Sequence, residues 1–127
     1  MATKPPTRDN RSARQVTRKA IPLEKANVHN GNKNANTDFL TSNITPSDYP
    51  VLFRVQVMLP SAGKFTAKIK KSTTTLTCHF NGGANLVASS LYIFDVLMHD
   101  GDSINFQSDQ NQNGHLLRVQ EVAWATQ

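Results

Sequence analysis

A chain of 127 residues with 14 basic and 9 acidic residues, one cysteine and 38% apolar residues is too short for two ordinary domains and too apolar to be wholly disordered. The charge is unevenly placed. Residues 1–33 hold eight basic and two acidic residues and carry a net charge of +6, whereas residues 34–127 carry −1. The basic character therefore belongs to the N-terminal part, and the rest of the chain is nearly neutral.

Membrane insertion and secretion are not expected. No apolar run approaches the roughly 20 residues that a membrane-spanning helix needs. The basic N-terminus lacks the apolar stretch of a secretory signal. Cys78 has no second cysteine in the chain with which to form an internal disulfide, which favours assembly in a reducing cytoplasm.

Residues 1–36 are predicted to form an extended basic arm. Pro5 and Pro6 disfavour a helix at its start, and the asparagine-rich tract at residues 27–36 has little to bury. Residues 12–21 could make two helical turns, which are marginal alone in water. We expect the arm to bind a partner through its charge and one apolar patch. The charged contacts are assigned to Arg8, Arg11, Arg14, Arg18 and Lys19, and the apolar anchor to Ile21 and Leu23.

From residue 37 onward, apolar and polar residues alternate with period two, which is typical of strands. Residues 53–59 and 65–69 are predicted to pair as a hairpin around a turn at residues 60–63. Further strands are expected at residues 74–80, 86–88, 91–98, 104–106 and 116–124, and the strand at 91–98 is almost continuously apolar. Strands at this spacing indicate a single β-sandwich or barrel over residues 37–127.

Two loops contain residues that could bind a metal ion. Residues 109–114 carry oxygen ligands at alternate positions followed by glycine, like the first half of a calcium loop. The position of the final acidic ligand is Gln120, so we interpret the segment as a polar hairpin loop. His99, Asp100 and Asp102 are interpreted as a tight turn. The histidines lack zinc-ligand spacing, and no nucleophile or phosphate-binding motif is present. We therefore predict no catalytic residue, metal site or cofactor.

Four lysines follow the polar face of one predicted strand and its exit. They are Lys64, Lys68, Lys70 and Lys71, which form a candidate basic face. Such a row can bind nucleic acid, and lysines on an exposed strand also prevent edge-to-edge aggregation. Both interpretations remain open from the sequence.

The C-terminal part of the chain contains four segments that resemble a known architecture. They are Asn85–Ala88, Leu91–Leu97, Gly101–Gln107 and Leu116–Val122. In order, they resemble strands of small jelly-roll virion proteins, especially tailed-phage decoration and accessory proteins. They also look like the C-terminal half of trimeric jelly rolls of the C1q and tumour-necrosis-factor type. The resemblance implies a β-sandwich with jelly-roll topology, assembly into a homo-oligomer, expected to be a trimer, and attachment to a larger particle without catalysis.

The leading hypothesis is a non-enzymatic viral structural protein, either a capsid decoration protein or an accessory virion protein. Its basic arm would attach it to neighbouring capsid or virion proteins, and nucleic acid could also bind there. Its location would be the virion, assembled in the host cytoplasm. The alternatives are a nucleic-acid-binding protein that uses the arm and the candidate basic face, and a carbohydrate- or receptor-binding sandwich that uses the loops at residues 81–85 and 109–114.

Overall fold

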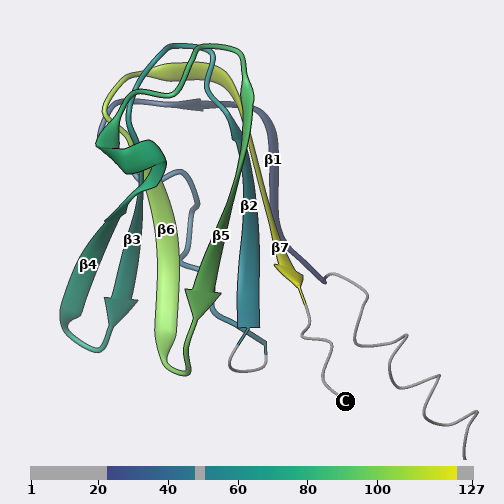
Figure 1. Cartoon of the computed structure of the whole chain (residues 1–127), viewed down its shortest axis with the longest axis vertical. Helices are drawn as coiled ribbons and strands as arrows, with labels where there is room; N and C mark the ends of the chain where they lie inside the picture. Colours follow the sequence, from purple (N-terminus) through teal and green to yellow (C-terminus); the bar gives the residue numbers. More distant parts are fainter. Residues whose placement is uncertain (1–22, 48–50, 123–127) are drawn as a thin grey trace, which may run out of the picture.

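The computed structural model describes residues 23–47 and 51–122, which form two antiparallel β-sheets packed around one core (Figure 1). One sheet has the strand order β1-β7-β2-β5 and the other the order β4-β3-β6. The predicted all-β fold is confirmed. The elements are β1 (Leu23–Lys33), β2 (Val51–Met58), β3 (Phe65–Lys71), β4 (Thr74–His79), a 3₁₀ turn η1 (Phe80–Gly83), β5 (Leu91–Met98), β6 (Asp102–Ser108) and β7 (Gln112–Val122).

Strand β1 lies in the segment that the sequence analysis assigned to the basic arm. It pairs with β7 from Leu23 opposite Glu121 to Lys33 opposite Gln112. Its half-buried Val28 packs against the core, although the surrounding asparagines and glycine suggested a tract with nothing to bury. The boundary expected at residue 36 is therefore wrong, because a long-range strand pairing outweighs the weak local preference. Residues 1–22 lie outside the described residues.

The predicted hairpin between residues 53–59 and 65–69 is also wrong. Strand β2 lies in the four-stranded sheet, whereas β3 lies in the other sheet. The connection at residues 59–64 crosses from one sheet to the other. Both strands turn their apolar faces into the same core. Alternating apolar and polar residues therefore fit two strands that face each other across a sandwich as well as two strands that pair in one sheet.

Aromatic rings join the two sheets inside the core. Phe65 of β3 is 1% exposed, and its ring centroid lies 5.4 Å from that of Phe80 and 5.6 Å from that of Phe106. Phe80 in turn stacks on Phe94 of β5 at 4.5 Å. On the other side of Phe65, Phe39 packs edge-on at 5.8 Å. These contacts connect the 3₁₀ turn and the segment before β2 to both sheets.

Residues 36–44 run beside the outer edge of β6. Asn36 donates its backbone N–H to Ser108 at 2.7 Å, and Phe39 donates to Phe106 at 2.8 Å. Ile44 pairs in both directions with Ile104. The segment is too irregular to be a regular strand, but it covers the free edge of the three-stranded sheet.

Candidate functional site

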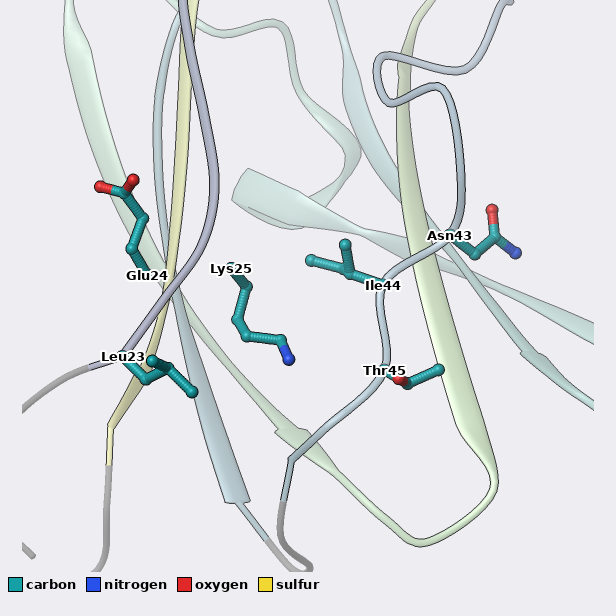
Figure 2. A pocket seen from close by; sticks show the side chains of 6 residues that line it. All are labelled: Leu23, Glu24, Lys25, Asn43, Ile44 and Thr45. Carbon is teal, nitrogen blue, oxygen red and sulfur yellow. The ribbon is translucent and has the colours of Figure 1, made fainter.

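A shallow hollow lies where the chain enters the sandwich, between the start of β1 and residues 43–45 (Figure 2). Its volume is about 320 Å³. Leu23 and Ile44 point into the gap from its two sides, and Glu24 points away from it (Figure 2). Lys25 crosses the hollow and donates from Nζ to the hydroxyl of Ser47 at 3.2 Å. The hollow thus has one apolar side chain on each side and a lysine between them, and its other lining residues are polar.

Leu23 is the one predicted arm contact that the structure describes. Its side chain is 49% exposed in the described part of the chain, so it offers apolar area at the entry to the sandwich. The other predicted contacts, Arg8, Arg11, Arg14, Arg18, Lys19 and Ile21, lie outside the described residues.

The candidate basic face is brought together only in part. Lys68 and Lys70 share the outer face of the three-stranded sheet, since alternate residues of β3 face the same side. Lys68 donates from Nζ to Thr77 of β4 at 3.0 Å. Lys64 is exposed just before β3, whereas Lys71 lies in the opposite phase of the strand, and its Cε is close to Gly101. Three of the four lysines can therefore serve one surface, and Lys71 belongs to the other.

Beside Lys68 and Lys70, the same sheet face contains a polar hollow of about 360 Å³. Its other lining residues are Asp38, Asn43, Thr75, Asn105 and Gln107. Several of these side chains already bond one another, since Gln107 donates to Asp38 at 2.8 Å and Asn105 donates to Asn43 at 3.0 Å. The surface can offer amides, a hydroxyl and two ammonium groups to a polar ligand, but it has no aromatic ring on which a base or a sugar could stack.

The loop at residues 109–114 uses its polar side chains to tie the sandwich together. Asp109 accepts from the backbone of Lys64 at 2.8 Å, and Asn111 accepts from the backbone of Ala35 at 2.7 Å. Gln112 is fully buried, and its amide both accepts from and donates to the backbone of Ser61. The interpretation as a polar loop accounts for these contacts. Within residues 23–47 and 51–122, no cluster of three or more acidic, histidine or cysteine side chains could hold a metal ion.

The turn at residues 99–102 has the geometry expected from its sequence. Asp102 accepts the backbone N–H of His99 at 3.0 Å through its carboxylate and donates its own N–H to the carbonyl of His99. Gly101 has a φ of 83°, which glycine adopts without strain. Asp102 thus shapes a turn that connects the two sheets.

The outer face of the four-stranded sheet was not identified from the sequence. Here β5 exposes Leu91, Ile93 and Leu97, and the intervening Asp95 forms a two-bonded ion pair with Arg54 of β2 at 2.9 and 3.1 Å. The hydrogen bonds from Arg54 hold the pKa of the Asp95 carboxyl below its usual range. The signal was present as an almost continuously apolar strand, which is typical of a strand covered on both faces.

Comparisons with protein-family models, with curated proteins and with solved structures find no match to this chain. No helix among the described residues is both long enough and apolar enough to cross a membrane. The functional argument therefore depends on the arrangement of the strands and surfaces themselves.

Proposed function

We propose that this protein is a non-enzymatic structural component of a virus particle, which attaches to neighbouring capsid or virion proteins through its basic N-terminal segment. The observation that supports this proposal best is the order of the strands. An eight-stranded jelly roll places its first, eighth, third and sixth strands in one sheet and its second, seventh, fourth and fifth strands in the other, and this fold is common in capsid proteins.

The chain matches this order when residues 36–44 take the second place. The sheet β1-β7-β2-β5 then has the order first, eighth, third, sixth. The segment, β6, β3 and β4 follow the order second, seventh, fourth, fifth, since the segment bonds along the edge of β6. A jelly roll whose second strand is irregular thus accounts for all seven strands and for the covered edge.

The N-terminal segment would provide the attachment. Residues 1–22 hold six basic residues and one acidic residue, and they join the sandwich at Leu23, beside the hollow of Figure 2. Positive charge on such a segment favours an acidic protein surface or the packaged nucleic acid. Exposed Leu23 would continue the contact with apolar area at the point where the segment leaves the body. The particle would form in the host cytoplasm, where the free thiol of Cys78 stays reduced.

Particle association tests this proposal directly. The full-length protein, carrying a C-terminal epitope, is expressed in cells that produce the particles, and its sedimentation with purified particles is measured on a density gradient. We expect co-sedimentation of the full chain and its loss on deletion of residues 1–22, which leaves β1 intact. A variant with Arg8, Arg11, Arg14, Arg18 and Lys19 changed to glutamine separates charge from length. Undiminished incorporation of the deletion variant, with an unchanged melting temperature, would refute attachment through this segment.

A second candidate function, nucleic-acid binding, is favoured by the shared position of Lys64, Lys68 and Lys70 on one sheet face. The dependence of DNA affinity on salt concentration tests whether this face binds nucleic acid. The double variant Lys68→Gln/Lys70→Gln should reduce the slope of log affinity against log salt by about 1.8, at about 0.9 per phosphate contact on duplex DNA. Lys71→Gln is the matched control. It removes one positive charge from the same strand, at a position whose side chain lies on the other face. Equal slopes for all variants would exclude this surface.

A further inference from the structure

Strand β5 leaves one edge of the four-stranded sheet open. It pairs with β2 over all eight residues, from Val51 opposite Met98 to Met58 opposite Leu91, without a register shift. In the part of the chain that the structure describes, no strand lies on its other side. A regular edge strand presents a row of unpaired N–H and C=O groups, which is a template for another strand.

Two of the other three sheet edges are interrupted or covered. Strand β1 is interrupted by register shifts on both sides of Gly31 and by a third between Glu24 and Ala26, and residues 36–44 cover β6. Strands β4 and β5 both contain no lysine, proline, glycine or bulge. Three of the six residues of β4 are threonine, and its partner strand β3 carries Lys68 and Lys70 beside it. Of these two regular edges, β5 is the one that exposes three large apolar side chains.

The side chains of β5 point to the same conclusion. On its outer face, Leu91 is 57% exposed, Ile93 56% and Leu97 45%. The only charged residue of the strand is Asp95, which is already paired with Arg54 of its own chain. The edge therefore carries apolar area and no uncompensated charge, which suits a neighbour with the same composition.

We propose that β5 pairs in antiparallel orientation with β5 of a second copy, about a two-fold axis at Phe94, so that the two four-stranded sheets join into one of eight strands. Residues opposite each other in an antiparallel pair lie on the same face. In this register, Leu91 lies opposite Leu97 of the second copy. The half-buried Tyr92 and Phe94 face Val96 and Phe94 of the second copy on the inner side.

The register is selected by the outer face. Leu97 continues a row with Leu52 and Val122, and Leu91 continues a row with Met58 and Leu116. Pairing about Phe94 joins the Leu97 row of each copy to the Leu91 row of the other, so that two apolar bands cross the junction, one at each end of the paired strands.

The neighbouring registers are less favourable. A register centred on Asp95 places two carboxylates opposite each other. One centred on Ile93 places Leu97 opposite Ser89, outside β5, so the two apolar rows are not joined. Pairing about Phe94 places Ile93 beside Asp95, whose carboxylate is already bonded to Arg54. Like charges directly opposite each other destabilise a strand pair, so the register about Phe94 is the favoured one.

A second copy fits this edge better than the N-terminal residues of the same chain. Residues 1–22 carry six basic residues and three prolines, Pro5, Pro6 and Pro22, and proline cannot donate to a strand ladder. Their cations would find no free carboxylate on β5. Pairing of two copies also uses both β5 edges and leaves only the interrupted β1 at the outer ends, so growth stops at the pair. This inference goes beyond the proposed function and does not depend on residues 1–22.

Charge exchange across the proposed pair provides the test. The oligomeric state of the full-length protein is measured by sedimentation equilibrium over a dilution series. We expect a species of twice the 14.0 kDa chain mass. In Leu91→Glu/Leu97→Glu, glutamates face each other at both ends of the paired strands. We expect the dissociation constant to rise by about tenfold or more, which corresponds to at least about 1.4 kcal/mol.

The variant Leu91→Lys/Leu97→Glu distinguishes this register from simple loss of apolar area. Residues 91 and 97 are about 20 Å apart within one strand, so lysine and glutamate cannot pair inside one chain. Across the two-fold axis they become partners, and we expect dimerisation to recover. Leu76→Glu, at a residue of β4 that is 61% exposed, is the matched control and should leave the dimer intact.

Circular dichroism melting checks that each variant is folded. A wild-type monomer at all concentrations would overturn the proposal. An oligomer that Leu91→Glu/Leu97→Glu leaves intact, or one that Leu91→Lys/Leu97→Glu does not restore, would also overturn it. Loss of particle attachment on deletion of residues 1–22 is measured independently of these variants.

Discussion

Asn105 fastens residues 36–44 to the edge of β6, and its replacement tests whether that segment is an integral part of the sandwich. The side chain is 2% exposed. Its Oδ1 accepts from the backbone of Leu40 at 3.0 Å and from that of Phe106 at 2.9 Å. Its Nδ2 donates to the carbonyl of Leu40 at 3.0 Å and to Asn43 at 3.0 Å. One amide thus satisfies both backbone groups of Leu40.

The change Asn105→Ala removes all four bonds. A buried polar group that loses its partner costs about 1–3 kcal/mol. Leu40 is half-buried, so water can recover part of the loss for its N–H and C=O. We therefore expect Asn105→Ala to lower the free energy of unfolding by about 2–3 kcal/mol. Asn105→Asp should be at least as harmful at neutral pH, because a carboxylate would face two acceptor oxygens.

Urea denaturation followed by circular dichroism measures the effect at constant pH. Asn43→Ala is the matched control, because Asn43 is exposed and shares one bond with Asn105, and it should cost less than about 1 kcal/mol. A loss below about 0.5 kcal/mol for Asn105→Ala would refute the reasoning. It would mean that water replaces the amide and that residues 36–44 are only loosely attached.

Two further predictions concern the contact between β1 and β7. Burial lowers the pKa of His115 below its ordinary value near 6.5, and the nearby backbone of Gln112 and Gly31 offsets this only in part. As the pH falls, the unfolded chain therefore binds a proton at His115 before the folded chain does, so the free energy of unfolding should decrease below about pH 6.5. In His115→Leu, this decrease should be smaller. Parallel pH profiles of wild type and variant, measured by urea denaturation, would contradict this assignment. Gly31→Ala would place a Cβ 2.7 Å from the His115 ring, so we expect a loss of about 1–3 kcal/mol in the same assay, and an unchanged midpoint would contradict the close packing.

Local alternation was sufficient to predict an all-β chain and most of its strands, because apolar residues at every second position can be buried on only one face. Local alternation was not sufficient to predict which strands pair with each other. The segments around β2 and β3 have the same pattern whether they pair or face each other across the core. In β1, the core contacts come from isolated residues such as Val28 among asparagines, and the strand exists because β7 offers a partner about ninety residues later.

The candidate surfaces differ in predictability for a related reason. The distribution of apolar residues over the two faces of a strand indicates which faces are covered. Strand β5 is apolar on both faces. Its inner face is accounted for by the core, through Val96 and Met98. Its outer face has no cover in the described part of the chain, although Leu91, Ile93 and Leu97 have the composition of buried residues. In an antiparallel sheet with one face in water, polar residues would be expected at these positions. The same pattern that predicted the strand therefore indicates a further contact for this face outside the described residues. The sheet order, which places β5 at the edge, is the observation that led us to propose the edge of a second copy as that contact.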